Sequence, residues 1–254
     1  MRTLVALLAC LAASLAASLA AAAPAPFASG PELGKWVTFY YLKPEPARAV
    51  EAIAAASRLG LMKDGKSSPS LIGFLSGVMR KEPAVAREAA SKLVSLPKAE
   101  QPVLALSLWY SGHPDTGKLL AGLARSVPEQ KEMYDELSQK AAPQLDQIPL
   151  EQGPWVLDAL WGNFMATGDE RPVLRVMTAL PWVDAQGDKA KALAGGAARW
   201  SLTSNAVRHP RVLAICKAQV RKQPKEVSVA LAEIIRNAEQ DLKAKAGAER
   251  KDAK

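Results

Sequence analysis

The sequence predicts an all-α protein built from stacked helical hairpins, and three observations lead to this prediction. Of the 254 residues, 49% are hydrophobic and only 6% aromatic, and alanine- and leucine-rich segments of this kind favour helix. Apolar residues recur at spacings of three and four, and no segment shows the alternation of a convincing strand. Five aromatic residues are each followed within 5 to 11 residues by a proline. The aromatic residues are Trp36, Phe74, Trp109, Trp161 and Trp200, and the prolines are Pro44, Pro83, Pro114, Pro172 and Pro210.

A hairpin of two short helices cannot bury its apolar side alone, so such units pack on one another. We therefore expect an α-solenoid or repeat-like right-handed superhelix of about five hairpins, with one extra helix and a C-terminal helix. Over most of the chain, the units resemble helical-hairpin repeats such as the tetratricopeptide and HEAT groups. The likeness concerns architecture alone: Tyr110-Ser111-Gly112 follows Trp109 where the tetratricopeptide consensus requires other residues.

The N-terminal 22 residues have the features of a secretory signal peptide. Arg2 precedes an uncharged run rich in Ala, Leu and Ser that ends before Pro24, and small residues at 20 and 22 suit cleavage after Ala22. We expect an exported protein, periplasmic or secreted, with no membrane span after cleavage. Two alternatives are an uncleaved anchor and a lipid on Cys10, because residues 7–10 resemble a lipoprotein box.

Charge and cysteine content restrict the partners and the compartment. Without residues 1–22 the chain has 32 basic and 25 acidic residues, a balance of +7. The two signs alternate along the predicted helices, which is typical of a solvated surface and not of a nucleic-acid interface. We expect a protein or an anionic envelope component as partner. Cys216 is then the only cysteine, and its apolar surroundings predict a buried, unreactive thiol.

The predicted helices follow from their proline and glycine boundaries. After a linker at 23–30, a first helix begins at Pro31 and is stopped by Pro44 and Pro46. A second helix runs from Pro46 to Gly60, and Ser68 is the candidate N-cap of a third. The remaining helices of the N-terminal half, which spans 31–141, are expected at 83–96, 102–111, 114–123 and, as the extra helix, 128–141.

The C-terminal half follows a proline-rich loop or hinge at 142–153. Helices are expected from Pro154 to Thr167, from Pro172 to Leu180, up to His209 after a loop at 181–188, and from Pro210 onward. A last helix is expected at 225–238, which ends the C-terminal hairpins (154–238). The charged tail at 239–254 is predicted to be a frayed or solvated helix end.

No motif predicts a catalytic nucleophile, a metal site or a cofactor. Residues 112–119 differ at one position from a phosphate-binding loop, because Leu119 replaces the required hydroxyl residue, and a helix precedes them instead of a strand. His113 and His209 are the only histidines, and each directly precedes a proline. Without further ligands they predict turn residues and not a metal site.

Candidate binding residues are aromatic or charged side chains near the predicted turns and at the edges of apolar helix faces. They are Tyr40, Tyr41, Tyr110, His113, Asp158, Asp169 and Arg171.

The sequence favours a binding or scaffold module that holds a macromolecular partner on a concave surface. One alternative is a cell-wall or envelope enzyme in which Asp158, Asp169 and Glu170 meet in a cleft. Another is a periplasmic carrier that shelters lipids or unfolded chains in an apolar groove.

Overall fold

The computed structural model describes residues 26–252. Within this part, all regular secondary structure is helical. Twelve α-helices and several short 3₁₀ turns are present, and the described residues contain no strand. The all-α prediction is therefore confirmed. The predicted signal peptide and Cys10 lie outside the described residues.

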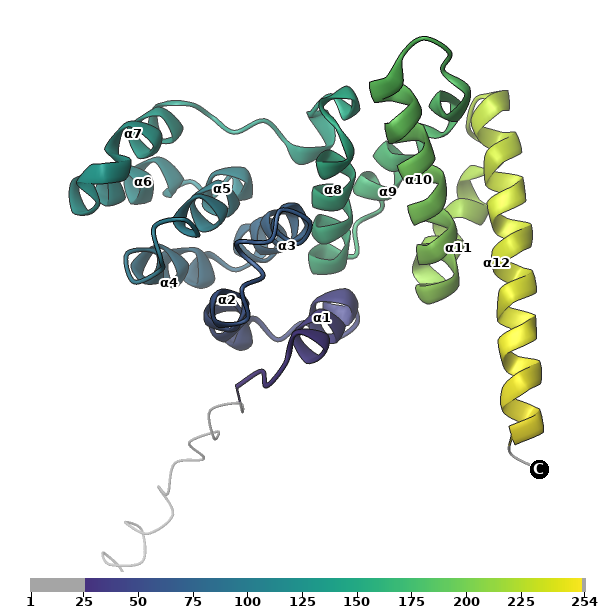
Figure 1. Ribbon diagram of the computed structural model, residues 1–254, viewed down its shortest axis with the longest axis horizontal. Helices are drawn as coiled ribbons and strands as arrows, with labels where there is room; N and C mark the ends of the chain where they lie inside the picture. Colours follow the sequence, from purple (N-terminus) through teal and green to yellow (C-terminus); the bar gives the residue numbers. More distant parts are fainter. Residues whose placement is uncertain (1–25, 253–254) are drawn as a thin grey trace, which may run out of the picture.

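Ten of the helices follow one another along the chain as five pairs whose members are in contact. The pairs are α1 (Gly30–Phe39) with α2 (Ala49–Arg58), α3 (Ser68–Lys81) with α4 (Pro83–Leu93), α5 (Gln101–Ser111) with α6 (Thr116–Ser126), α8 (Pro154–Thr167) with α9 (Glu170–Met177), and α10 (Lys189–Arg208) with α11 (Pro210–Gln219). The extra helix is α7 (Lys131–Gln139), and α12 (Lys225–Asp252) ends the described chain. Figure 1 shows α6 and α7 at one end of the molecule and α12 at the other.

Prolines begin the helices and glycines end them, for the expected physical reasons. Pro83, Pro154 and Pro210 are the first residues of α4, α8 and α11, where the missing N–H has no helical acceptor. Gly112 and Gly168 end α5 and α8 with φ of 63° and 66°, a left-handed conformation that strains other residues.

The structure corrects two predicted boundaries. Ser68 is not the N-cap of α3, because Ser67 holds that position and the Ser68 hydroxyl donates to the carbonyls of Met62 and Asp64. The last helix does not end near residue 238 but continues to Asp252. Residues 241–248 are all exposed, as expected of a solvated helix end.

The closest helix contact joins α3 to α8 at the centre of the molecule (Figure 1). A Cβ atom added to Gly73 would lie 1.8 Å from the carbonyl oxygen of Ala159, and one added to Gly162 would lie 2.0 Å from that of Ser70. The two backbones therefore touch directly, which only glycine permits. We call this contact the α3–α8 junction.

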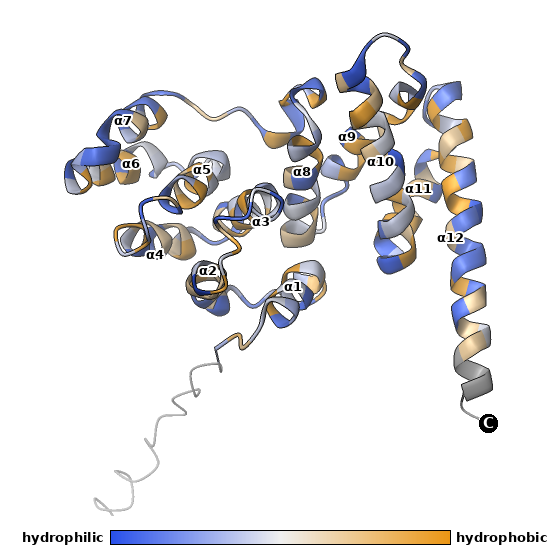
Figure 2. Ribbon diagram, in the orientation of Figure 1, coloured by the Kyte–Doolittle hydropathy of each residue, from blue (hydrophilic) through white to orange (hydrophobic). Residues whose placement is uncertain are grey.

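Two clusters of buried apolar side chains meet at this junction, one mainly from residues 27–134 and the other from residues 145–238. Figure 2 shows orange, hydrophobic residues where neighbouring helices face one another. Because α8 packs on α3, the fourth hairpin contacts the second as well as the fifth.

The five aromatic residues are not equally buried. Phe74 is 0% and Trp161 is 5% exposed, while Trp36 and Trp109 are half-buried. Trp200 is 75% exposed, so its prediction as a packing anchor is wrong. It lies on the face of α10 that points away from the core.

Two further features complete the fold. Phe27, within the segment predicted as a linker, is buried against Trp36, with ring centroids 5.2 Å apart. Cys216 is fully buried, which confirms the prediction of a buried thiol, and burial raises its pKa to about 12.

None of the helices in the described part of the chain has the length and apolar character needed to span a bilayer.

Candidate functional site

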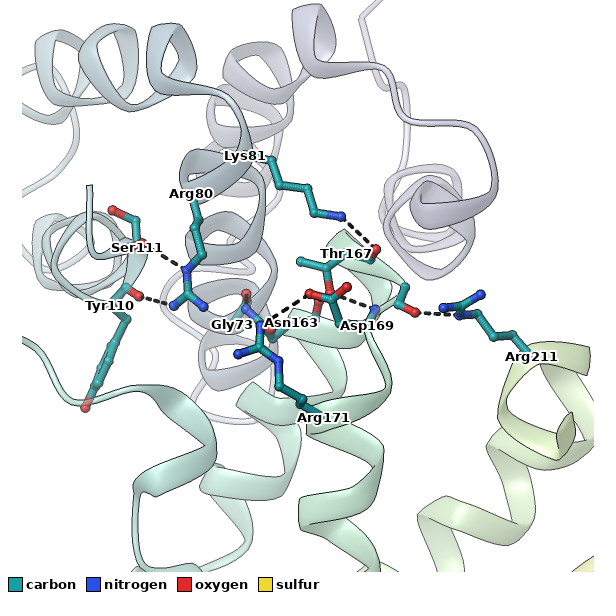
Figure 3. A network of polar contacts seen from close by, with 11 residues as sticks. Gly73, Arg80, Lys81, Tyr110, Ser111, Asn163, Thr167, Asp169, Arg171 and Arg211 are labelled. Carbon is teal, nitrogen blue, oxygen red and sulfur yellow. Dashed lines mark hydrogen bonds and ion pairs between the residues drawn. The ribbon is translucent and has the colours of Figure 1, made fainter. Parts of the chain in front are cut away.

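Basic side chains at the end of α3 link the C-termini of two other helices (Figure 3). Arg80 Nε donates to the carbonyl of Ser111 and Nη2 to that of Tyr110, both at 3.0 Å. Lys81 Nζ donates to the carbonyl of Thr167, the last residue of α8, at 2.8 Å. The final carbonyls of a helix lack partners within it and carry partial negative charge, so cations stabilise them.

Arg211 from α11 adds a second basic contact at the end of α8, because its Nε donates to the carbonyl of Gly168. The end of α8 therefore lies between a lysine of α3 and an arginine of α11. At the start of the following turn, the Asp169 N–H donates to the Thr167 hydroxyl at 3.1 Å. These contacts fix the α8–α9 turn against both halves of the molecule.

A second guanidinium, that of Arg171, lies near Arg80. Its Nη2 atom is 3.6 Å from Asp169 Oδ2, and both side chains are largely exposed. Burial and the like charge of Arg171 lower the pKa of Arg80, and the carboxylates of Asp146 and Asp169 oppose this change. Arg80 and Arg171 both line one surface hollow, and the carboxylates of Asp146 and Asp169 lie close enough to affect the charge of Arg80.

This hollow is a cavity of about 430 Å³, which we call the arginine groove. It is lined by Arg80, Tyr110, Ser111, Gly112, Ala142, Pro143, Gln144 and Arg171. Beneath it, a void of about 10 Å³ is lined in part by Asp146 and Asn163, and this volume suits a single water molecule. The Asn163 amide donates to the carbonyl of Gly73 at 3.4 Å, which ties the floor of the groove to the α3–α8 junction.

One wall of the arginine groove is an extended stretch of backbone. Residues 141–144 have no regular secondary structure, and Lys140 and Gln144 have extended ψ values of 133° and 142°. The backbone N–H groups of Ala141, Ala142 and Gln144 donate no hydrogen bond to any described residue. Such groups are available to a ligand.

A neighbouring cavity of about 390 Å³ shares Gly112 and Ala142 with the arginine groove. Its lining includes Trp109, His113 and Thr116. The Trp109 indole N–H donates to the carbonyl of Lys140 at 2.8 Å and so holds the start of the extended segment. The His113 Nδ1 atom accepts from the Asp115 N–H at 3.1 Å, as expected of a turn residue.

The structure brings together four of the seven predicted binding residues. Tyr110 and Arg171 line the arginine groove, Asp169 contacts Arg171, and His113 lines the adjoining cavity. Burial raises the pKa of Tyr110. Sequence reasoning missed Arg80, although two basic residues in the last turn of a predicted helix are a recognised signal for contacts with carbonyl groups.

The other three predicted residues lie elsewhere. Asp158 is exposed on α8, outside both cavities, and partial burial of its carboxyl raises the pKa. Tyr40 is buried in the core; burial, with smaller effects of Glu82 and Glu45, raises the pKa of its hydroxyl to about 12.

Tyr41 contacts a buried histidine. Its hydroxyl oxygen lies 3.3 Å from Nδ1 of His209, whose ring also packs on Phe39 and Phe164 with centroids 5.2 and 6.0 Å away. His209 is 0% exposed, and its Nε2 atom has no hydrogen-bond partner. Burial and the nearby charge of Arg208 lower the pKa of His209 to about 4, so the ring is neutral at pH 7.

The two histidines thus occupy separate environments and share no site. Across residues 26–252, no group of three or more His, Cys, Asp or Glu side chains is arranged to hold a metal ion. The residues that resemble a phosphate-binding loop follow a helix: 112–115 form the turn after α5, and 116–119 are the first residues of α6.

Comparisons with known proteins find no matching family model, no similar curated protein and no similar solved structure.

Proposed function

We propose that this protein is an exported helical binding module that holds an extended, acidic segment of a macromolecular partner in the arginine groove. The observation that carries the proposal is the position of two guanidinium groups beside an extended backbone with unpaired N–H groups. A partner segment in extended conformation would accept hydrogen bonds from this backbone while one of its carboxylates lies near the guanidiniums.

The existing ion pair beside the groove is weak enough for a carboxylate of the partner to replace it. The contact between Arg171 and Asp169 is 3.6 Å long and largely exposed, and pairs of this kind contribute about 0–1 kcal/mol. A partner carboxylate therefore competes with a weak interaction. Arg80 is already oriented by two helix carbonyls, so little of its side-chain freedom is lost on binding.

The proposal includes the arrangement of the hairpins as a solenoid. We propose that α1 to α7 and α8 to α12 are two short runs of hairpins that meet at the α3–α8 junction, with the groove beside it. The right-handed superhelix remains a prediction, as do export and the partner in the envelope.

The geometry gives less support to the enzyme alternative. Asp158 lies in the N-terminal half of α8, and Asp169 and Glu170 follow its C-terminus. Eleven residues of helical rise correspond to about 16 Å, well beyond the roughly 5–9.5 Å between the carboxyl groups of glycosidases. The three carboxylates therefore do not meet in one cleft.

Binding is tested with envelope extract and immobilised protein. Arg171→Glu is expected to abolish capture of a partner that the wild type retains, because it reverses the charge at the groove without removing a helix cap. Arg87→Glu makes the same charge change at an exposed position of α4 and serves as the control. Equal capture by all three proteins, or turnover of wall fragments without capture, would contradict the proposal.

A further inference from the structure

The arginine groove continues into the neighbouring cavity of about 390 Å³. Apart from Arg80 and Arg171, the lining of both cavities comes from residues 109–117 on one side and residues 137–144 on the other. Gly112 and Ala142 line both cavities. The two cavities are therefore parts of one crevice. We call the second part, whose lining includes Trp109, His113, Thr116, Leu137 and Lys140, the tryptophan pocket.

The unpaired backbone groups of the crevice extend across both parts of it. The N–H groups of Ala141 and Ala142 belong to the wall of the tryptophan pocket, and those of Ala142 and Gln144 belong to the wall of the arginine groove. None of the three donates a hydrogen bond to any described residue. An extended ligand that pairs with this backbone therefore passes from one cavity into the other.

The tryptophan pocket is held open by contacts within the protein. The Trp109 indole N–H donates to the carbonyl of Lys140 at 2.8 Å, so the side chain reaches from one wall to the other. The backbones of the two walls are also close, because a Cβ atom added to Gly117 would lie 3.1 Å from the carbonyl oxygen of Ser138. A pocket that is already formed loses little conformational freedom when a ligand enters it.

His113 supplies an unused hydrogen-bond donor to the tryptophan pocket. Its Nδ1 atom accepts from the Asp115 N–H at 3.1 Å, so Nδ1 carries no proton and the ring proton is on Nε2. His113 is only 9% exposed, and among the described residues nothing accepts a hydrogen bond from Nε2. Unlike Nε2 of His209, this atom is not sealed in the core, so a ligand in the pocket can accept its hydrogen bond.

The chemistry of the tryptophan pocket differs from that of the arginine groove. Trp109 and Leu137 contribute apolar surface, and the ammonium group of Lys140 is already 2.7 Å from the carboxylate of Glu136. A fitting group has an apolar, planar body that packs on the indole and an oxygen atom that accepts from His113. Among side chains, tyrosine combines these two properties.

We propose that the segment bound in the arginine groove carries a tyrosine close to its acidic residue, and that this tyrosine occupies the tryptophan pocket. The inference rests on the proposed function, from which it takes the acidic residue. An extended chain advances about 3.3–3.6 Å per residue. Because the two cavities adjoin, we expect the tyrosine within three residues of the acidic one.

Fluorescence anisotropy with labelled peptides and the chain from residue 23 tests this pairing. Each peptide has one glutamate in a glycine–serine background, with tyrosine, phenylalanine or alanine one to three positions to either side. At the best position, tyrosine should strengthen binding at least about tenfold over alanine and about fivefold over phenylalanine, because an aromatic contact and one hydrogen bond are gained.

The peptides also separate the two proposals. Arg171→Glu should weaken the binding of every glutamate peptide, whereas Arg87→Glu, at an exposed position on α4, should not. If no glutamate peptide binds at millimolar concentration, or if Arg171→Glu has no effect, the proposed function is wrong and this inference is wrong with it. If glutamate peptides bind through Arg171 but tyrosine gives no gain at any position, only the present inference is overturned.

Substitutions in the pocket test where the tyrosine lies. His113→Gln keeps an N–H donor and should retain the difference between tyrosine and phenylalanine, whereas His113→Leu should remove it and still bind the phenylalanine peptide. Ala141→Trp fills the pocket from an exposed position of its wall and should abolish the gain from tyrosine. Ala84→Trp, exposed on α4, should have no effect. A tyrosine preference that survives both His113→Leu and Ala141→Trp would reject the tryptophan pocket as its site.

Discussion

The α3–α8 junction and the solvent-exposed side of α10 differ in the size of the residues found there. At the junction, Gly73 and Gly162 are covered by the backbone of the opposing helix. On the exposed side of α10, Trp200 is 75% exposed. The comparison teaches that residue size alone does not predict burial in this protein. Two glycines mark its tightest helix contact, whereas one tryptophan is mostly exposed to solvent and another, Trp161, is buried.

Substitution of two tryptophans should produce the largest difference between the regions. Trp161→Ala should destabilise the protein by about 3–5 kcal/mol, because this ring is buried in the core near the junction. Trp200→Ala should change stability by less than about 0.5 kcal/mol. Urea unfolding measures both, and similar losses for the two variants would contradict the comparison.

Glycine substitution should have opposite signs in the two regions. Gly162→Ala should cost about 3 kcal/mol, because the added methyl group would overlap the carbonyl of Ser70 and force the helices apart. Gly196→Ala should stabilise the protein by roughly 0.5–1 kcal/mol, because the space there is open and alanine favours helix. Thermal unfolding compares them, and a stabilising Gly162→Ala would show that the junction is not tightly packed.

Burial of His209 among aromatic rings should make the stability of the protein depend on pH. Its ring contacts α8 and the segment after α1. The pKa of His209 is about 4 in the folded chain, against about 6.5 unfolded, so the unfolded chain binds the proton more tightly. Stability should therefore fall as the pH decreases from 6.5 to 4, by up to about 3 kcal/mol.

The matched variants for this effect are His209→Phe and His113→Gln. His209→Phe cannot take up the proton and should lose this part of the pH dependence, whereas His113→Gln should keep it. Unfolding free energies measured at several pH values between 4 and 7 would show the contribution. An unchanged slope in His209→Phe would assign the effect to other groups.

Removing a helix cap at the junction should have the smallest effect. Lys81→Met keeps the length of the side chain but loses the hydrogen bond to the carbonyl of Thr167, and should cost about 0.5–1 kcal/mol. Lys92→Met, at an exposed position on α4, is the control and should be nearly neutral. A Lys81→Met variant as stable as the control would show that this contact contributes nothing measurable.

Much of the helix order follows from local chemistry and could be predicted. Proline fixes φ and lacks an N–H, so it is favoured in the first turn of a helix. Pro83, Pro154 and Pro210 are each the first residue of a helix. The α3–α8 junction could not be predicted, because its glycines add nothing to an apolar pattern and their partners are about 90 residues away. The exposure of Trp200 was missed for the same reason: periodicity identifies a face of a helix without showing what covers it.

The candidate site was predictable only in part. Tyr110, Asp169 and Arg171 were selected for their position near turns, and the fold brings them to one groove. Arg80 completes the groove, but its neighbours in sequence are charged residues of both signs, which suggested a solvated surface. Its role depends on the carbonyls of α5, 30 residues later: a basic last turn predicts a contact with helix carbonyls, but not which helix supplies them.

The direct contact between Gly73 and Ala159 also constrains how the chain is assembled. Synthesis delivers the N-terminus first at about 5–20 residues per second, so roughly 4–17 s separate the appearance of α3 from that of its covering helix. During this interval the bare glycine side of α3 has no partner to cover it. We therefore expect the second hairpin to acquire its native packing late, and a nascent chain stopped before residue 154 to remain sensitive to protease around α3.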